Sequence, residues 1–201
     1  DGDLAAMGAR LATLTKAIGE HYEAIIVVDE HGIVKADGLG GATTGIDISG
    51  RQYFADAKNG KSSVGTPVKS RNSGNPISVV AVPLYGPGNR FSGALCVVLK
   101  IDFLIDIITG TRVGSTGYGF MIDHEGTIIA HPRKELILDL NISKVSGMEG
   151  VSKKMLAGES GVASYVFEGI PKLAGFAPVP LTGWSVCLTQ DASELLAEAY
   201  N

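Results

Sequence analysis

The residue best suited to binding chemistry is Arg51, which follows a polar segment that begins at Asp47. Residues 49–58 have the pattern of a short helix, with a Ser–Gln capping box at the start and Gly60 as the stop signal. Arg51 is then expected in the first turn, where the helix dipole disfavours a cation. An anion held by its guanidinium and by the backbone N–H groups of the helix start would explain this position, and an arginine–carboxylate pair contributes about 1.5–3 kcal/mol. The alternative is a surface arginine paired with Asp47 or Asp56.

No group of residues has the spacing of a catalytic or metal site. The run that begins at Gly60 resembles a phosphate loop, but alanine stands where that motif needs its first glycine. The segment 158–161 lacks the spacing of a nucleophile elbow. The four histidines form no pair at metal-ligand spacing, and His131 is best explained by a structural hydrogen bond. We therefore expect no enzyme activity, no cofactor and no metal ion.

The composition is that of a globular protein without a strong charge bias. The chain has 201 residues, of which 45% are hydrophobic, and its formal net charge is −4. No block of like charges is present, so nucleic acid is not an expected partner. The apolar runs are far shorter than the roughly 18 residues of a transmembrane helix, and the acidic start lacks the basic region of a signal peptide. Cys96 and Cys187 lie in apolar runs, which favours two buried thiols over a disulfide.

The elements that would position Arg51 follow from the hydrophobic pattern. Apolar residues recur at steps of three and four over residues 3–22, which predicts an amphipathic helix. This helix begins without a cap, so we expect the chain to be excised from a longer protein. A hairpin, the short helix, three strands and a closing helix are predicted next, over residues 24–37, 49–58, 64–69, 77–84, 91–100 and 101–108.

The same order of elements repeats in the second half of the chain. Three residues of the first hairpin have counterparts 94 positions later; the pairs are Asp29 with Asp123, Gly32 with Gly126, and Ala36 with Ala130. A helix, three strands and a terminal helix follow, over residues 150–157, 161–167, 172–179, 184–189 and 192–200. The predicted fold class is therefore α+β: a long N-terminal helix and two tandem PAS-like units, each with a five-stranded antiparallel sheet. The expected divisions are residues 1–22, 23–108 and 109–201.

Several segments, in this order along the chain, resemble the double Cache family of bacterial sensor domains. They are Asp47-Ile-Ser-Gly-Arg-Gln-Tyr-Phe-Ala-Asp-Ala57, Val64-Gly-Thr-Pro-Val-Lys-Ser-Arg71 with Gly74 and Pro76, Ala81-Val-Pro-Leu-Tyr85, Gly117-Tyr-Gly-Phe-Met-Ile-Asp123 and His131-Pro132. The resemblance covers essentially the whole chain. It implies the extracytoplasmic (periplasmic) sensor of an inner-membrane receptor, such as a methyl-accepting chemotaxis protein. It also implies flanking transmembrane helices outside this segment, and a homodimer in the full-length receptor.

The resemblance further implies where the ligand binds. Residues 23–108 correspond to the membrane-distal unit, which usually binds the ligand, and residues 109–201 to the membrane-proximal unit. An arginine at the position of Arg51 commonly grips a ligand carboxylate, and an aromatic residue two positions later, here Tyr53, walls the pocket. Three further residues complete the expected site: Ser70, Arg71 and Tyr85.

The sequence departs from the amino-acid-binding branch of the family where that branch holds the ligand ammonium. The branch uses a tyrosine and two carboxylates, and the aligned positions here are Val68, Ser70 and Val98. An ammonium buried without a carboxylate costs several kcal/mol. We therefore expect a small organic acid as the ligand. Should the alignment shift within the loop, Asp37 or Asp102 would be available to an amine.

Three alternatives stay open from the sequence. The domain senses an amino acid or amine, it belongs to a histidine kinase or diguanylate cyclase receptor, or it is a structural, partner-binding ectodomain with an empty pocket. A carboxylate facing the pocket near Val98 and Ser70 would favour an amino acid. A sealed pocket without polar lining would favour the structural role.

Overall fold

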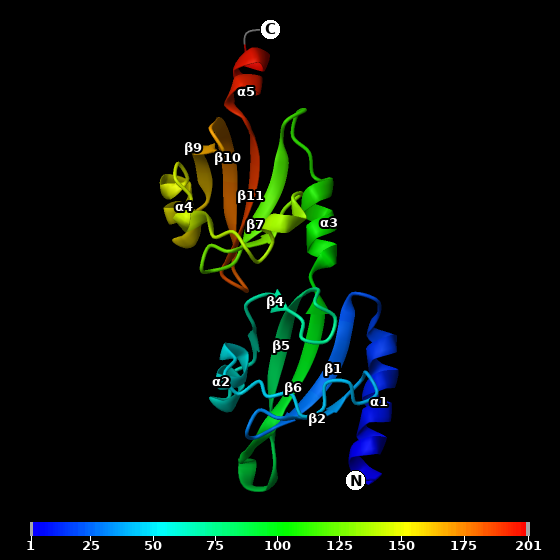
Figure 1. Ribbon diagram of the computed structural model, residues 1–201. Helices are drawn as coiled ribbons and strands as arrows, with labels where there is room; N and C mark the ends of the chain where they lie inside the picture. The colour runs from blue at the N-terminus through cyan, green and yellow to red at the C-terminus, as the bar shows by residue number, and fades with distance from the viewer. Residues whose placement is uncertain (1, 200–201) are drawn as a thin grey trace. The chain divides into compact units, whose positions relative to one another are not determined.

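Two antiparallel sheets, one in each half of the chain, form the framework of the protein (Figure 1). The computed structural model describes residues 2–199. The chain divides after Ile101 into two units, and each unit combines one sheet with helices. The predicted α+β class, with a helix followed by two antiparallel sheets, is confirmed.

The first unit contains a sheet with the strand order β2-β1-β6-β5-β3, in which β4 also pairs with β5. Its elements are α1 (Gly2–Ile18), β1 (Tyr22–Asp29), β2 (Val34–Asp37), α2 (Gln52–Lys58), β3 (Ser63–Val64), β4 (Val68–Lys69), β5 (Pro76–Tyr85), a 3₁₀ turn (Pro87–Asn89) and β6 (Phe91–Lys100). The single strand predicted over 64–69 is thus two short strands. Pro67 lies between them and has no N–H to donate to a ladder.

The second unit contains a five-stranded sheet with the corresponding order β8-β7-β11-β10-β9. Its elements are α3 (Asp102–Gly110), β7 (Tyr118–Ile122), β8 (Ile128–Ala130), 3₁₀ turns (Lys134–Leu136 and Ile142–Lys144), α4 (Glu149–Leu156), β9 (Gly161–Phe167), β10 (Ile170–Val179), β11 (Trp184–Asp191) and α5 (Ala192–Ala199). Tyr200, the last residue of the predicted terminal helix, lies outside the described residues.

The helix that was predicted to close the first unit belongs to the second. This helix, α3, packs on β7 and β8, whereas α1 packs on β1 and β2 of the first unit. The boundary predicted after residue 108 therefore lies after Ile101. Both units consequently begin with a helix that rests on the first hairpin of their own sheet, so the internal repeat includes these helices as well.

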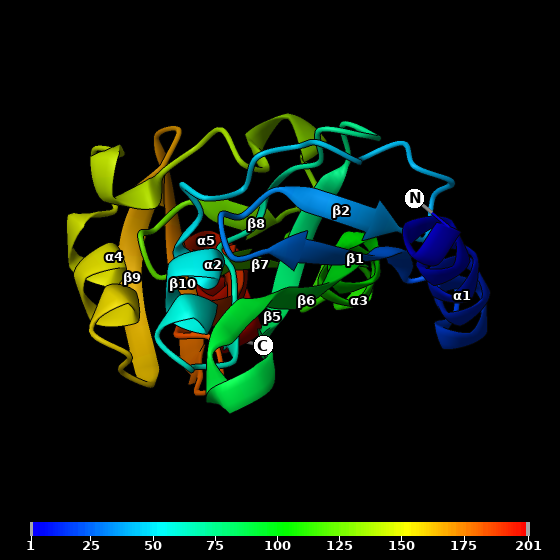
Figure 2. The same ribbon diagram turned by 90° about the horizontal axis from the view of Figure 1, so that it is seen from below.

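Side chains that alternate along β1 serve two separate cores of the first unit. Ala24 and Ile26 face α2 and join the larger core, while Ile25 faces α1 and packs with Leu11. Figure 2 shows α1 beside β1 and β2, and α2 beside β5. Close contact with α1 requires Gly38, because a Cβ there would lie 2.9 Å from the Leu11 carbonyl oxygen.

The repeat seen in the sequence is a repeated hydrogen-bond pattern in the structure. The Asp29 carboxylate accepts bonds from the N–H groups two and four residues later, both at 3.0 Å. The Asp123 carboxylate accepts the corresponding two bonds at 2.9 Å. Gly32 and Gly126 close the turns at φ 86° and 92°, which glycine adopts without strain. The aspartate and glycine at this spacing therefore define the hairpin in both units.

Candidate functional site

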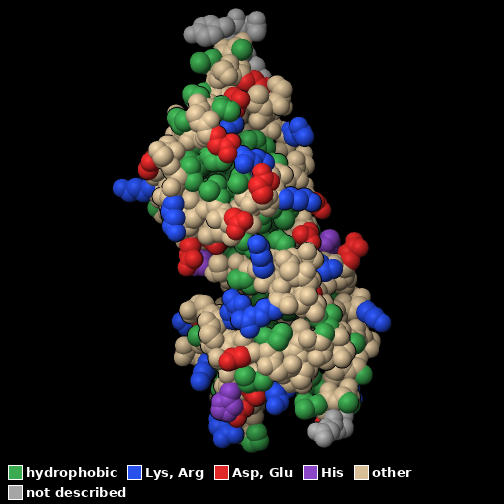
Figure 3. Space-filling view, viewed as in Figure 1, with side chains coloured by type: hydrophobic (Ala, Val, Ile, Leu, Met, Phe, Trp, Pro, Cys, Tyr) green, Lys and Arg blue, Asp and Glu red, His purple; other side chains and the backbone are tan. Residues whose placement is uncertain are grey.

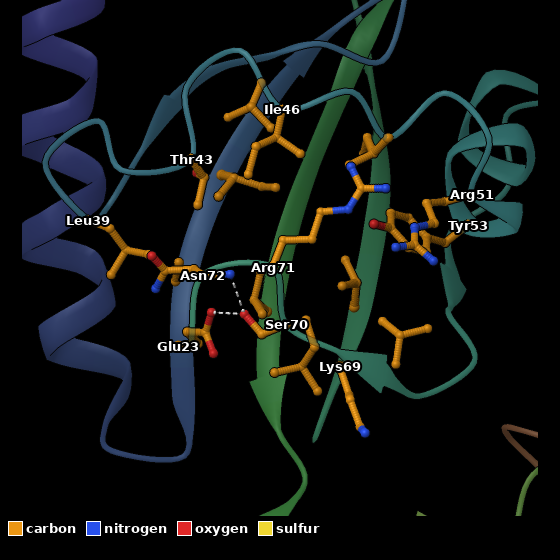
Figure 4. A pocket seen from close by; sticks show the side chains of 18 residues that line it. Glu23, Leu39, Thr43, Ile46, Arg51, Tyr53, Lys69, Ser70, Arg71 and Asn72 are labelled. Atoms are coloured by element: carbon orange, nitrogen blue, oxygen red, sulfur yellow. Dashed lines mark hydrogen bonds between the residues drawn. The ribbon is translucent and has the colours of Figure 1, made fainter. Parts of the chain in front are cut away.

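The first unit contains a pocket between its sheet, the loop after β2, the start of α2 and the loop after β4 (Figure 4). About 70 Å³ of it is open to the centres of water molecules. Buried aliphatic side chains form much of the wall: Ala24, Ile26, Val34, Ile48, Ile77, Val79 and Val98. The polar lining consists of Glu23, Thr43, Arg51, Tyr53, Lys69, Ser70, Arg71 and Asn72. Basic side chains gather beside a hydrophobic patch on this face of the unit (Figure 3).

Four of the five expected site residues line this pocket, namely Arg51, Tyr53, Ser70 and Arg71. Tyr85 does not, and its side chain is 48% exposed. Strand β5 contributes Val79 to the pocket, and a strand rises about 3.3 Å per residue, so the end of β5 lies roughly 20 Å farther on. Tyr85 is therefore removed from the expected site.

Arg51 is the N-cap of α2, not a residue of its first turn. Its backbone is extended at φ −90° and ψ 137°, and no side chain caps the helix. The predicted capping box fails because Ser49 lies in a turn: its N–H donates to Asp47 Oδ1 at 2.8 Å. The N–H of Arg51 then donates to the Ile48 carbonyl at 2.9 Å. Arg51 still stands at the positive end of α2, as the sequence predicted.

The Arg51 side chain is a cation with no protein partner among residues 2–199. Within residues 2–199 its guanidinium makes no hydrogen bond or ion pair. The two carboxylates considered as surface partners bond elsewhere, Asp47 to a backbone N–H and Asp56 to the Gln52 amide at 2.9 Å. A half-buried guanidinium at an apolar pocket is free to take an anion from solution.

Tyr53 forms a wall of the pocket, as expected, and Phe54 belongs to the core. The Tyr53 side chain is buried, and this burial raises the pKa of its hydroxyl to about 12, so the group stays neutral and able to donate. The ring fits there because position 65 is glycine, where a Cβ would lie 2.5 Å from a Tyr53 ring carbon. Phe54 packs against Phe91 with ring centroids 6.0 Å apart.

Arg71 supplies a second cation at the mouth of the pocket. Its side chain runs across the opening from the loop after β4 toward Arg51 and Tyr53 (Figure 4). Arg71 Nη1 donates to the Asp47 carbonyl oxygen at 3.2 Å, which ties it to the opposite rim. The carboxylate of Asp47 has a lowered pKa, chiefly because of its bonds with Ser49 and to a lesser degree because Arg71 is near.

Glu23, which the sequence analysis missed, places a carboxylate in the same pocket. Its Oε1 accepts a bond from Ser70 Oγ at 2.5 Å, and its Oε2 accepts one from Ser73 Oγ at 2.6 Å. The side chain is half-buried. Among the residues that the structure describes, no Lys, Arg or His lies within ion-pair distance of it. The pocket therefore contains an unpaired anion as well as an unpaired cation.

A β-bulge explains why the sequence pattern did not reveal Glu23. Strict alternation would place Glu23 on the face of Ile25, against α1. The pairing of β1 with β6 shifts between Tyr22 and Ala24, and such a bulge redirects the side chain at that point. The remaining signal in the sequence is an acidic residue directly before an apolar strand, which is too common to identify a site.

Neither aspartate that was considered for an amine serves the pocket. Asp37 is 1% exposed, and its carboxylate accepts bonds from three backbone N–H groups and the Thr43 hydroxyl. Burial acts to raise its pKa, but these bonds, led by those from Thr43, hold the pKa below its ordinary value. Asp102 begins α3 in the second unit. Asp37 thus shapes the loop after β2, and Asp102 lies outside this site.

His131 holds the same place in the second unit that Asp37 holds in the first. Its Nδ1 accepts a bond from the Arg133 N–H at 2.9 Å, just as Asp37 accepts one from the Leu39 N–H at 2.9 Å. Burial lowers the pKa of His131 to about 4, so the ring is neutral near pH 7. The structural hydrogen bond expected of His131 is therefore present.

The second unit has a pocket at the corresponding place, but aromatic rings nearly fill it. Only about 10 Å³ is open to the centres of water molecules. Tyr118 and Phe120 stand 94 positions after Ala24 and Ile26, so rings replace the small and aliphatic side chains of the first pocket. Tyr165 and Phe167 add two more rings from β9.

Two further expectations concern metals and membranes. Over the described residues, no cluster of three His, Cys, Asp or Glu side chains is arranged to hold a metal ion. None of the helices found between residues 2 and 199 combines the length and the hydropathy that crossing a bilayer requires.

Comparison with known proteins gives consistent matches across the chain. The Cache domain family matches residues 4–199. The methyl-accepting chemotaxis protein TlpA of Bacillus subtilis (strain 168) is 28% identical over 141 residues, which are 70% of this chain and 20% of TlpA. The extracellular domain of mmHK1S-Z3, named as a histidine kinase, has a TM-score of 0.79 at 18% identity over 100% of this chain and 83% of that one. The ligand-binding domain of Mlp24 with asparagine has a TM-score of 0.71 at 20% identity over 99% of this chain and 83% of that one.

These matches differ in what they establish. The structural likenesses are at low sequence identity and concern the fold. The chain spans about a fifth of the length of TlpA, so TlpA as a whole has further parts. The family match runs through both units and nearly the whole chain. The chain therefore belongs to the Cache domain family of sensor domains.

Proposed function

We propose that this chain is the extracytoplasmic ligand-sensing region of a methyl-accepting chemoreceptor, and that its first unit binds a free α-amino acid. The receptor would sit in the inner membrane, with this region in the periplasm and the first unit distal to the membrane. Support for the receptor class comes from the relatives, which are named as methyl-accepting chemotaxis proteins. The activity proposed for the domain is binding, without catalysis.

The observation that carries the ligand class is the pair of unpaired charges in one pocket. Arg51 and Glu23 both line the pocket, and neither has an ionic partner among the described residues. An α-amino acid presents a carboxylate and an ammonium on one carbon, so it can satisfy both groups. Arg71, beside Arg51, would share the carboxylate, and the apolar wall would take the side chain.

Glu23 changes the ligand expected from the sequence. A simple organic acid was expected because Val68, Ser70 and Val98 offer no carboxylate to an ammonium. Glu23 is hydrogen-bonded to Ser70 and lies on β1 directly before Ala24, which pairs with Val98 of β6, so a carboxylate does face that part of the pocket. A simple acid would leave Glu23 unpaired and would add a second negative charge near it. The simple acid is therefore the second choice.

The test compares molecules that carry one charge or both. L-Alanine, its deaminated form propionate and its decarboxylated form ethylamine are titrated calorimetrically, with L-serine and L-asparagine as larger zwitterions. Each missing charge pair costs about 1.5–3 kcal/mol, so propionate and ethylamine should bind at least about tenfold more weakly than alanine. Propionate binding as tightly as alanine would restore the simple acid as the ligand.

Two substitutions examine the anchor directly. Arg51→Ala should abolish binding of the zwitterions, and Arg51→Lys should restore only part of it, since a point charge lacks the two-point geometry of the guanidinium. Arg90→Ala, an exposed arginine of the same unit outside the pocket, is the matched control and should bind normally. Normal binding by Arg51→Ala would contradict the assignment.

A histidine kinase receptor is the second candidate for the whole protein. The observation in its favour is the TM-score of 0.79 with the extracellular domain of mmHK1S-Z3. The sensor chemistry would be the same, and only the cytoplasmic part would differ. Sequencing of the gene beyond the codon for Asn201 distinguishes the two, because a methyl-accepting signalling domain and a kinase domain have unrelated sequences.

A further inference from the structure

The loop formed by residues 70–75 covers the pocket of the first unit from one side. It connects β4 to β5, and three of its residues, Ser70, Arg71 and Asn72, line the pocket. The loop is closed on itself by two backbone bonds, from Ser70 N–H to the Asn75 carbonyl at 2.8 Å and from Gly74 N–H to the Ser70 carbonyl at 2.9 Å. It therefore moves most easily as one body.

The sheet itself holds this loop weakly. Strand β4 has only two residues, and they pair with Ile77 and Pro76 of β5. Proline has no N–H, so the pair of Lys69 with Pro76 lacks one donor of a regular ladder. The loop residues 71–75 are exposed to solvent. A segment with so few backbone bonds to its sheet opens at lower free-energy cost than the sheet.

Glu23 ties the loop to the far side of the pocket. Ser70 is a buried residue, 7% exposed. Its Oγ accepts bonds from the N–H groups of Asn72 and Ser73 at 3.1 Å and donates its own proton to Glu23 Oε1. Ser73 Oγ donates to Glu23 Oε2. Glu23 lies on β1, and β6 separates β1 from β5, so these two bonds span the strand between them. Bonds of a hydroxyl to a carboxylate are stronger than bonds between neutral groups.

On the opposite rim, one bond holds the loop. Arg71 Nη1 donates to the Asp47 carbonyl oxygen at 3.2 Å, a longer bond than either serine–Glu23 bond. Figure 4 shows the Arg71 side chain crossing the pocket while Ser70 faces Glu23. If the two serine–Glu23 bonds opened, the Arg71 bond and the pairing of β4 would be the hydrogen bonds left, among the described residues, to keep the loop over the pocket.

We propose that residues 70–75 are the lid of the ligand pocket and that Glu23 is the latch of this lid, closed by the hydroxyls of Ser70 and Ser73. The inference rests on the proposed function in treating the pocket as the ligand site. Glu23 then has two roles. In the protein without ligand it positions the lid, and when an amino acid is bound its carboxylate pairs with the ligand ammonium. A ligand enters and leaves when both serine–Glu23 bonds open.

The test measures lid opening in protein without ligand. Trypsin cleaves after arginine, so cleavage between Arg71 and Asn72 reports how often the lid leaves the pocket. Cleavage after Arg112, which is exposed in an irregular segment of the second unit, serves as the internal reference and is followed in the same digest by mass spectrometry. The compared quantity is the ratio of the two cleavage rates.

Three variants separate the latch from other effects. Glu23→Ala removes both acceptors and should raise the ratio by about tenfold or more, because a bond to a charged group is worth at least one factor of ten. Ser73→Ala removes one of the two latch bonds, at an exposed hydroxyl where a bond contributes less, leaves the Glu23 charge in place and should raise the ratio by about threefold or more. Glu30→Ala removes an exposed carboxylate of the first hairpin and should leave the ratio unchanged.

The outcomes are distinct from those of the amino-acid titrations. Melting curves show whether each variant is folded, and if Glu23→Ala unfolds, Ser73→Ala carries the test. Faster cleavage after Arg71 in Ser73→Ala, with an unchanged Glu30→Ala, supports the latch. An unchanged ratio in Ser73→Ala overturns it. Because no ligand is present, a failure of amino-acid binding would leave this result intact, and a failed latch would leave the ligand class intact.

Discussion

Gly65 fixes the position of the Tyr53 ring without touching a ligand. Its N–H donates to the Val79 carbonyl oxygen at 2.8 Å, so its backbone is held by β5. A Cβ at this position would stand 2.5 Å from a carbon of the Tyr53 ring, closer than side chains approach. Any residue larger than glycine must therefore displace the Tyr53 ring. Because Tyr53 lines the pocket, the pocket is the space into which the displaced ring would move.

We expect Gly65→Ala to weaken amino-acid binding by about tenfold, because the displaced Tyr53 ring enters the space the ligand needs; overpacking of this kind costs about 1–3 kcal/mol. Calorimetric titration of L-alanine measures the change. Gly175→Ala is the matched control, since a Cβ there meets nothing within 4 Å and lies in the second unit. Unaltered binding by Gly65→Ala would show that the Tyr53 ring does not border the ligand.

His131 makes the stability of the second unit depend on pH. Its pKa is about 4 in the folded protein against an ordinary value of 6.5, first because of burial and second because Arg133 is near. The unfolded chain therefore takes up a proton at a pH where the folded chain does not. The contribution of His131 to stability is complete above about pH 6.5 and is lost as the pH falls toward 4. Glu135 and Glu168 also lie near and act in the opposite direction.

We expect acidification from pH 6.5 to pH 4 to lower the free energy of unfolding by up to about 3 kcal/mol through His131. His131→Asn removes this dependence while its side-chain oxygen can still accept the Arg133 N–H, as the Asp37 oxygen does for Leu39. Urea unfolding at both pH values, in both proteins, measures the difference. Equal losses of stability in the two proteins would contradict a neutral, buried His131.

At the scale of elements, the pattern of apolar residues predicted most strands because sheet faces impose a period of two. The hairpins and β6 lie where the alternation placed them. The pattern failed where local hydrogen bonds overrule it. Pro67 interrupts the strand predicted over 64–69, and the Ser49 N–H donates to Asp47 instead of to the Gln52 side chain, which would accept it in a capping box.

For the candidate site, the sequence predicted the residues whose side-chain direction depends only on the local segment that contains them. Arg51 and Tyr53 stand at the start of a helix whose buried residues, Tyr53 among them, pack toward the sheet, so their location follows from local pattern. Glu23 depends on a bulge in the pairing of β1 with β6, which are far apart in sequence. Tyr85 was wrongly included because its motif lies on β5, while the part of β5 under the pocket lies nearer its start.

Helix α1 presents a row of apolar side chains that its own sheet does not cover. Leu11 is 6% exposed and packs on the sheet, whereas the exposed fractions of the other members are 39% for Leu4, 38% for Met7, 50% for Leu14 and 38% for Ile18. Their near-heptad spacing suits a second copy of the helix. A row this short buries less area than stable interfaces require, so the isolated chain should associate weakly.

We expect this chain to be monomeric at micromolar concentration and to associate only near millimolar concentration, through α1. Leu14→Glu should abolish that association with little change in melting temperature, because Leu14 is half exposed. Sedimentation equilibrium measures both states. Leu181→Glu, on a side chain that is 85% exposed in the second unit, is the control. A tight dimer at micromolar concentration, or association unaffected by Leu14→Glu, would contradict this role of α1.

At the scale of the whole chain, the two units share a framework but differ in how the space between sheet and loops is filled. Their hairpins have the same hydrogen bonds, and their sheets have corresponding strand orders. The first unit leaves about 70 Å³ open and leaves the charge of Arg51 unpaired. The second leaves about 10 Å³, and its buried Lys172 is already paired with Asp191 at 2.5 Å. Of these two pockets, as lined by the described residues, the one in the first unit therefore combines open space with an unpaired charge.

We expect one amino acid to bind per chain, in the first unit, because the second unit would have to displace aromatic rings to admit one. Tyr118 and Tyr165 face its pocket, and the Lys172 ammonium lies 5.0 Å from the Tyr118 ring centre, so moving these rings would also disturb a buried ion pair. Calorimetric titration of L-alanine should give a stoichiometry of about one, and Arg51→Ala should remove all of the heat. Substitutions at Tyr165, such as Tyr165→Phe, should leave both the stoichiometry and the affinity unchanged. A second binding event, or heat that persists in Arg51→Ala and disappears on substitution of Tyr165, would place a ligand in the second unit instead.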